Sequence, residues 1–161
     1  METQKAEKEI LDLINRAKII IPKEYAENLK INALTNQPEW HSFESEIWRI
    51  GEDIRQILSK NPKLKNNEKL FECLLEIATN KNAKRGRQSF ILLFGSIKQS
   101  KHSEKLITQI NDEFVSGHII DTIYKMKTGN YSNEIKPFCN NKFAWIRNTA
   151  KKYIKKHEQI G

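Results

Sequence analysis

The sequence predicts an all-α protein: an α-solenoid of antiparallel helix pairs with an N-terminal helical extension. Three observations support this fold class. Gly and Pro are few, 6 and 4 in 161 residues, whereas the helix formers Lys, Glu and Leu are common. Apolar residues recur at steps of three and four along most of the chain. Beyond residue 66 this pattern repeats with an offset of 30 residues, and such a period is typical of an α-solenoid.

The first sixty residues predict three helices. An apolar stripe over residues 3–20 predicts the first. Pro22 follows and suits the first turn of a second helix over residues 23–34. The segment "TNQP" at 35–38 ends that helix, and a longer third helix is expected over residues 39–60. Its stripe keeps helical spacing over about five turns and consists of Trp40, Phe43, Ile47, Ile50, Ile54, Ile57 and Leu58.

The segment "NPKLKNN" at 61–67 is the strongest internal boundary, because Pro and polar residues separate two periodic regions there. The net charge changes at the same place. Residues 1–60 carry 9 Lys and Arg against 11 Asp and Glu, whereas residues 61–161 carry 19 against 9. We expect residues 1–60 to pack as a cap on three helix pairs formed by residues 61–161, within a single compact domain.

The repeat is clearest in three segments that align without gaps: "AKRGRQSFILLFGSIK", "EFVSGHIIDTIYKMK" and "FAWIRNTAKKYIKKH". Apolar residues fall in register at the offset of 30, first Phe90, Ile120 and Ala150, then Leu93, Ile123 and Tyr153. A shorter helix is expected before each segment. Ser103 and Ser132 are the expected N-caps of the second and third of these shorter helices.

The last segment resembles the second helix of a HEAT repeat. In that pattern a polar turn leads to an apolar residue, an Arg, a small residue three positions on, and an apolar pair. The matching positions here are Asn141, Ile146, Arg147, Ala150, Tyr153 and Ile154. The other two segments match less well, since Phe90 replaces the small residue and Gly117 replaces the Arg. The resemblance covers about residues 67–157 and implies a right-handed solenoid.

Four residues of this helix are expected to have a structural role. Ile146, Ala150 and Tyr153 lie on its apolar stripe, and a small residue at 150 suits a close crossing of two helices. The resemblance implies that Arg147 pairs with an acidic or amide group of a neighbouring turn. The candidates for that partner are Asp112, Asn140 and Asn141.

Two basic clusters are the candidate binding residues. "KNAKRGR" places Lys84, Arg85 and Arg87 at a turn and helix start, where free amides and cations attract anions. Lys151 and Lys155, like Lys152 and Lys156, lie four apart and form two exposed ridges that no core requires. A second interpretation stays open. The chain has 22 Lys but only 6 Arg, with 15 Asn, so the charge can also reflect composition.

No catalytic, metal or cofactor motif is present, so we expect none of these sites. The four His residues are scattered, and Cys73 and Cys139 have no metal-ligand spacing. HEAT-like alkylpurine DNA glycosylases use a carboxylate near tryptophans, and Trp48 lies four residues before Glu52; that activity is a remote third hypothesis. More simply, Trp40, Trp48 and Trp145 pack in the core. Glu44, Glu46, Glu52 and Asp53 then form a solvated face of the long helix.

These observations favour a non-enzymatic protein-binding or adaptor module with an acidic partner. The alternative is a nucleic-acid binder that contacts phosphates without base specificity. "FILLFGSI" is shorter than the roughly 20 residues of a membrane span, and "METQKAEKEI" lacks the apolar centre of a signal peptide. We expect a cytoplasmic protein. The partner and the oligomeric state stay open.

Overall fold

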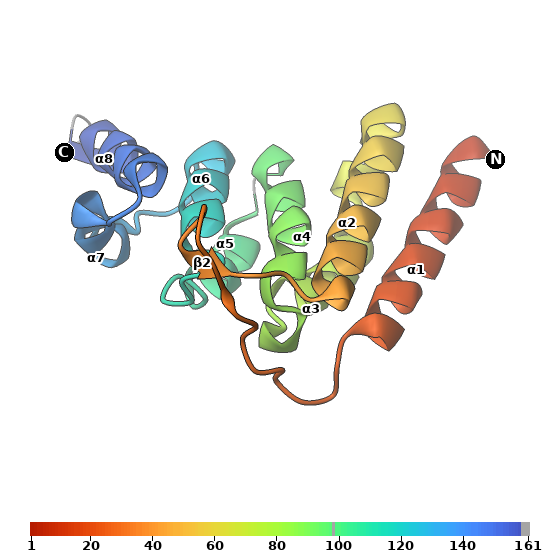
Figure 1. Ribbon diagram of the computed structural model, residues 1–161. Helices are drawn as coiled ribbons and strands as arrows, with labels where there is room; N and C mark the ends of the chain where they lie inside the picture. The colour runs from red at the N-terminus through yellow and green to blue at the C-terminus, as the bar shows by residue number, and fades with distance from the viewer. Residues whose placement is uncertain (98, 159–161) are drawn as a thin grey trace. The chain divides into compact units, whose positions relative to one another are not determined.

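The computed structural model describes residues 1–97 and 99–158 and confirms the all-α class (Figure 1). Helix makes up 72% of the described residues, which form eight α-helices and one ladder of two very short strands. The chain forms two compact units, Met1–Phe90 and Ile91–Gly161. We call them unit 1 and unit 2. In the part of the chain that the structure describes, no helix combines the length and apolar character needed to cross a membrane.

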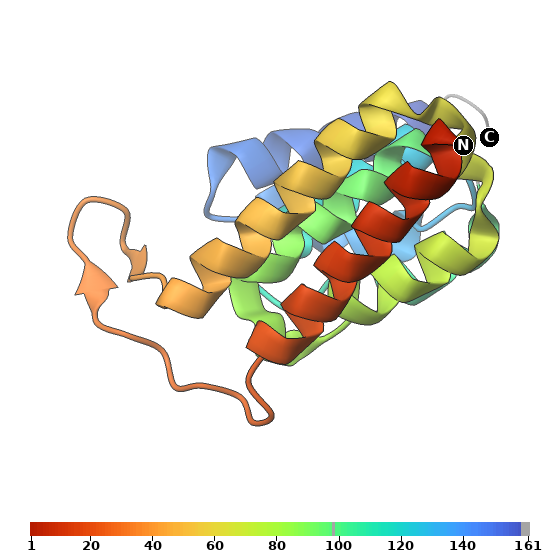
Figure 2. The same cartoon turned by 90° about the vertical axis from the view of Figure 1, so that its right-hand side faces the viewer.

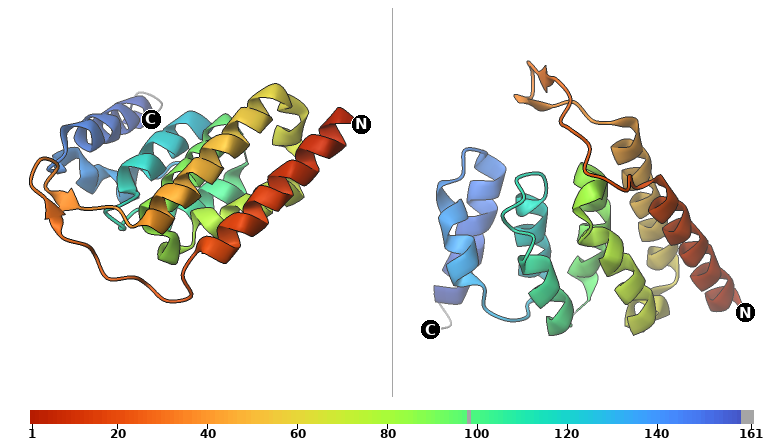
Figure 3. Two further views of the ribbon diagram at one scale, coloured as in Figure 1. Left: turned by 45° about the vertical axis from the view of Figure 1, so that its right-hand side comes forward. Right: turned by 90° about the horizontal axis from the view of Figure 1, so that it is seen from below.

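Two long helices, α1 (Glu2–Ile20) and α2 (Ser42–Lys60), lie side by side in unit 1 (Figure 3). Near the end of α1, Arg16 Nη2 lies 3.0 Å from Glu46 Oε1 at the start of α2, so the helices run in opposite directions. Their facing stripes are buried and follow the expected spacing. The buried apolar residues are Ala6, Ile10, Ile14 and Ala17 of α1 and Ile47, Ile50, Ile54 and Leu58 of α2.

Short helices follow α2 in unit 1. The 3₁₀ turn η1 (Pro62–Asn66) leads into α3 (Glu68–Ala78), where the Asn67 side chain accepts the Leu70 amide as N-cap. A second 3₁₀ segment, η2 (Lys81–Arg87), then leads into α4 (Gln88–Leu93). The segment 81–97 is therefore not one continuous helix.

The predicted helix over residues 23–34 is wrong. Residues 22–41, which we call the arm, are extended and carry an antiparallel hairpin of β1 (Ile31–Asn32) and β2 (Gln37–Pro38) (Figure 2). The Asn32 side chain accepts the Leu34 amide at 2.9 Å and so stabilises the hairpin turn. A helix would use the carbonyls of this segment internally, but side chains from η2 bind several of them instead.

Unit 2 contains η3 (Phe94–Ser96), α5 (Ser100–Ile107), α6 (Ser116–Met126), α7 (Ser132–Ile135), η4 (Lys136–Asn140) and α8 (Ala144–Glu158). The predicted N-caps are wrong by a few residues. Gln99 occupies the N-cap position of α5 without a side-chain bond to the helix, so Ser103 lies inside that helix and is buried. Tyr131 precedes α7, so Ser132 is its first residue.

The positions that align at the offset of 30 are buried alike. Phe90, Ile120 and Ala150 have no exposed surface, and Leu93, Ile123 and Tyr153 are also buried. They lie on α4, α6 and α8, and the shorter helices α3, α5 and α7 precede these three. The repeat in the sequence therefore corresponds to a repeated pattern of burial. The right-handed solenoid, its antiparallel pairs and the cap formed by residues 1–60 stay predictions.

Gly51 in α2 offers a test of the packing in unit 1. A Cβ atom there would lie 2.0 Å from Ser89 Oγ and 2.7 Å from Ser89 Cβ. We expect Gly51→Ala to lower the free energy of unfolding by about 1–3 kcal/mol through overpacking, although Ala normally favours a helix interior. Urea denaturation followed by circular dichroism measures the change.

The matched control is Gly95→Ala, whose Cβ would meet only the flexible Lys125 side chain at 3.3 Å. We expect this substitution to change stability by less than about 0.5 kcal/mol. Adding Ser89→Gly to Gly51→Ala removes the main clash, so the double variant should regain stability, as a double-mutant cycle measures. Equal stability of the Gly51→Ala variant and the parent protein would contradict the close approach of α2 to Ser89.

Candidate functional site

The basic cluster around η2, which the sequence offered as candidate binding residues, is buried. Lys84 and Arg87 are 0% exposed and Arg85 is 3% exposed. Arg87 Nη1 donates to the Ala78 carbonyl at 3.1 Å, at the end of α3, where a cation suits the free carbonyls and the helix dipole. These side chains are engaged within the chain, and two of them hold the arm.

Glu44 is the centre of this arrangement, and its complete burial corrects the prediction that it lies on a solvated face of α2. Glu44 Oε2 accepts the His41 amide at 2.7 Å, so the carboxylate caps the first turn of its own helix. Glu44 Oε1 accepts the Arg85 amide at 3.0 Å and Arg85 Nε at 3.1 Å. A buried carboxylate is stable only with such partners.

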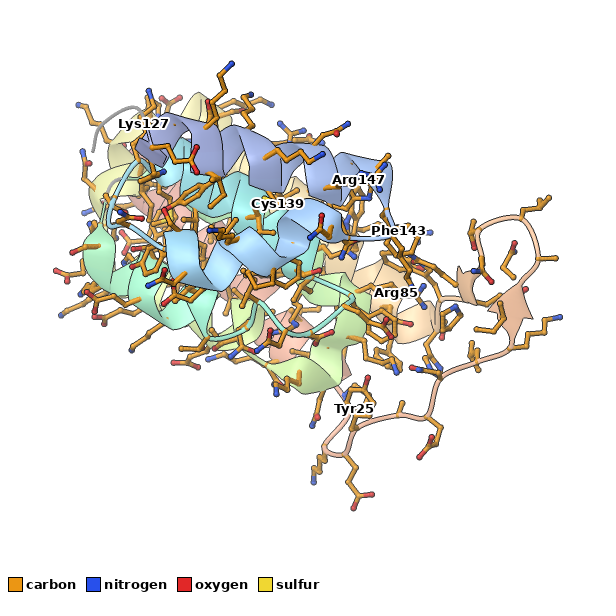
Figure 4. The ribbon with its side chains drawn as sticks, turned by 90° about the vertical axis from the view of Figure 1, so that its left-hand side faces the viewer. Tyr25, Arg85, Lys127, Cys139, Phe143 and Arg147 are labelled. Carbon is orange, nitrogen blue, oxygen red and sulfur yellow. The ribbon has the colours of Figure 1, made fainter. Side chains whose placement is uncertain are left out.

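Arg85, which is labelled in Figure 4, also binds the returning limb of the arm, residues 38–40. Its Nη1 donates to the Pro38 carbonyl at 2.6 Å, and its Nη2 donates to the Glu39 carbonyl at 2.7 Å. The Arg85 guanidinium lies 4.9 Å from the ring centre of Trp40, which is itself exposed. Trp40 therefore lies outside the core, contrary to the prediction.

The outgoing limb of the arm, residues 22–28, is held by Asn82 and Lys84. Asn82 Nδ2 donates to the carbonyls of Pro22 and Lys23 at 3.1 and 3.0 Å. Lys84 Nζ donates to the Ala26 carbonyl at 2.8 Å, and it lies 4.2 Å from the ring centre of Tyr25. The backbone of Lys84 has a φ of 50°, a left-handed conformation that costs energy in a non-glycine residue. The contacts of its side chain offset that cost.

The tip of the arm exposes apolar side chains. Leu34 is 96% exposed and Ile31 is 58% exposed, and Leu29 and Tyr25 are also exposed. The limbs are fixed, because η2 holds residues 22–28 and 38–40, and His41 Nε2 donates to the Glu27 carbonyl at 2.8 Å. The arm is thus a fixed support for exposed apolar groups, which in a folded protein often mark an interaction site.

The lysines of α8 lie on the surface of unit 2, as their spacing predicted. Lys151, Lys152 and Lys155 are exposed and Lys156 is half-buried. Lys152 Nζ and Lys156 Nζ lie 4.7 and 4.9 Å from the ring centre of Tyr124 on α6. Of the seven predicted binding residues, only these four are on the surface.

Trp145 lies at the start of α8 and is 49% exposed, so it is not a core residue as predicted. A Cβ atom at Gly117 would lie 2.1 Å from Trp145 Cη2, so the indole lies directly over the α6 backbone at a position that only glycine leaves open. The His118 ring meets the indole edge-on, with centroids 5.4 Å apart. We call the surface formed by Trp145, Lys152, Lys156, His118 and Tyr124 the α6–α8 face.

Burial lowers the pKa of His118 to about 4, although the nearby Asp121 carboxylate acts to raise this pKa. Lys125 Nζ lies 2.8 Å from Asp121 Oδ2 and reduces that attraction. His118 is therefore neutral at neutral pH, and the α6–α8 face takes its positive charge from lysines.

The four expected structural residues lie at packing and turn positions. Ile146, Ala150 and Tyr153 are buried, and the Tyr153 hydroxyl accepts the Tyr131 amide at 3.0 Å. Arg147 Nη1 donates to the Asn141 carbonyl at 2.8 Å, in the turn before α8 (Figure 4). The partner of Arg147 there is thus a backbone carbonyl of one candidate residue, and not a side-chain group.

In residues 1–97 and 99–158, no three His, Cys, Asp or Glu side chains come close enough to hold a metal ion. A hollow of about 180 Å³ in unit 1 is lined by residues that include Lys18, Ile77 and Glu76. The ion pair of Lys18 and Glu76, 2.5 Å long, lies at its wall. Comparison of the chain with protein-family models, curated proteins and solved structures finds no match.

Arg85 provides a test of how the arm is held. We expect Arg85→Met to lower the free energy of unfolding by about 3–5 kcal/mol, because Glu44 stays buried without its cation. The same change frees the limb at Pro38 and Glu39, so trypsin should cleave at Lys30 faster. Urea denaturation and timed proteolysis with mass spectrometry measure the two effects.

Arg55→Met is the matched control, because Arg55 pairs with Glu52 on the surface of the same unit. We expect a loss below about 1 kcal/mol from that change. The double variant Glu44→Gln with Arg85→Met should lose less stability than Arg85→Met alone, since no charge is left buried. Equal losses for the buried and the surface arginine would contradict this account.

His118 makes stability depend on pH. The unfolded chain binds a proton at this residue near its ordinary pKa of 6.5, whereas the folded chain resists protonation down to about pH 4. The contribution of His118 is therefore complete above about pH 6.5 and is lost as the pH falls toward 4. Between about pH 7 and 5 we expect a loss of about 2 kcal/mol that His118→Asn lacks. Parallel urea titrations of both proteins at several pH values measure it, and identical pH slopes would contradict the prediction.

Proposed function

We propose that the chain is a non-enzymatic, HEAT-like protein-binding module that engages its partner through the arm. The observation that carries this proposal is the nearly complete exposure of Leu34 at the tip of an arm whose limbs are held by buried cations. An exposed apolar side chain on a flexible tail has a large entropic cost of binding, whereas a preorganised arm has already lost that freedom. The arm is therefore suited to insert Leu34, Ile31 and Leu29 into another protein.

The charge of the arm limits the partner. Residues 22–41 carry Lys23 and Lys30 against Glu24, Glu27 and Glu39, so the arm is close to neutral. It fits an apolar groove better than a strongly acidic surface. The acidic partner expected from the sequence now has less support, because Lys84, Arg85 and Arg87 are buried. A cytoplasmic location fits this proposal and stays a prediction.

Site-specific photo-crosslinking followed by a direct binding measurement tests the proposal. A photoreactive amino acid at position 34 should form an adduct with a defined protein in cells. The matched control position is 19, because Ile19 is also an exposed apolar residue of unit 1, 84% exposed, but lies on α1. The protein found at 34 and not at 19 is then purified and titrated against the parent chain, Leu34→Asp and Ile19→Asp.

We expect Leu34→Asp to raise the dissociation constant at least about tenfold, since a charge replaces an apolar anchor. Ile19→Asp should leave the dissociation constant unchanged. The proposal fails if no protein crosslinks specifically at position 34, or if the purified protein binds Leu34→Asp as tightly as the parent. An adduct between two copies of the chain would mean that the arm mediates self-association and does not bind another protein. Gel filtration would verify this result if the parent chain forms an oligomer that Leu34→Asp does not form.

A further inference from the structure

The α6–α8 face of unit 2 combines aromatic rings with unpaired cations along one line. Positions 145, 152 and 156 lie on the same side of α8, because they are separated by seven and four residues. Both ends of this line contact α6. Trp145 lies over Gly117, and the ammonium groups of Lys152 and Lys156 lie beside Tyr124. The two helices therefore run in the same direction and present one continuous surface.

The charge of this surface is not balanced by nearby acids. Lys152 and Lys156 share one aromatic ring, and within residues 1–97 and 99–158 neither has an ion pair. Asp121, on the same helix as Tyr124, is already paired with Lys125 at 2.8 Å. Lys151 and Lys155 extend the positive charge along the next ridge. Like charges along one helix face repel one another, and the phosphates of a bound strand would replace that repulsion by attraction.

The aromatic part of the face indicates which polyanion it fits. The indole of Trp145 is about half open to solvent, and its position over Gly117 and beside the His118 ring fixes it at the surface. A flat, fixed and exposed ring is a platform on which an unpaired base can stack. An acidic protein segment would use the lysines but would gain nothing comparable from the indole, and the bases of a duplex are already stacked.

We propose that the α6–α8 face binds single-stranded nucleic acid, with the α8 lysines on the phosphates and Trp145 stacked on a base. This proposal uses unit 2 alone and does not rest on the proposed function of the arm. From Trp145 to Lys156 the helix axis extends about 16 Å at 1.5 Å per residue, so the face covers only a few nucleotides. Lysines contact phosphates as point charges, so binding is independent of base sequence.

Fluorescence polarisation of the full chain with a labelled 20-nucleotide oligo(dT) tests the proposal. Four phosphate contacts to a single strand give a slope of log K against log salt of about −3. The affinity should therefore fall about fiftyfold between about 50 and 200 mM salt. Lys152→Gln with Lys156→Gln should reduce the slope to about −1.4. Trp145→Leu should weaken binding about tenfold without changing the slope, and Trp145→Phe should retain most of the affinity.

Lys105→Gln with Lys136→Gln is the matched control, because it removes the same charge from exposed lysines of unit 2 outside the face. This variant should keep the slope of the parent chain, and circular dichroism verifies the folding of every variant. The proposal is overturned if oligo(dT) does not bind at about 50 mM salt, or if the control lowers the slope as much as Lys152→Gln with Lys156→Gln. It is also overturned if a DNA duplex or poly-glutamate binds as tightly and Trp145→Leu has no effect.

Discussion

In unit 1 the carboxylate of Glu44 lies at the first turn of α2 without contact to water, and most of the local structure is arranged around it. Arg85 supplies the charge that makes this burial tolerable, and the same guanidinium binds two carbonyls of the arm. Gly86 contributes by its lack of a side chain, since a Cβ there would lie 2.8 Å from the Glu44 carbonyl. One ion pair therefore joins the start of α2, the η2 turn and the returning limb of the arm.

The regular parts of the fold were predictable from the sequence because they depend on local periodicity. The stripes of α1, α2 and α3, and the buried positions at the offset of 30, follow directly from apolar spacing. The arm was not predictable in this way. Its sequence has helix-forming residues and a plausible start at Pro22, but its carbonyls are bound by side chains some sixty positions away, such as Lys84 to Ala26. Tertiary contacts override local preference there.

In the candidate site, too, the features set by local spacing were predictable and those set by tertiary contacts were not. The ridges of Lys151, Lys152, Lys155 and Lys156 were predictable because helical spacing alone puts them outside the apolar stripe. The burial of Lys84, Arg85 and Arg87 was not predictable, since a basic turn has the same sequence whether it faces water or a buried carboxylate. A partial signal existed in Glu44, three residues after His41, which is the spacing of a helix-capping pair. Trp145 was misassigned because its indole lies at the surface over Gly117 of another helix, and no local pattern pairs position 145 with Gly117.

The arm joins two helices that are antiparallel neighbours, and a connection of two to eight residues commonly serves that purpose. Its twenty residues thus exceed what the connection of α1 to α2 requires. The stripes of both helices are buried by helical neighbours, and the arm meets the rest of unit 1 mainly through backbone carbonyls, groups that every amino acid provides. Side chains at the tip can therefore change during evolution while the helical scaffold keeps its packing. In an engineered protein, the same hairpin would be a natural place to display a foreign loop, provided that the carbonyls bound by Arg85 keep their positions.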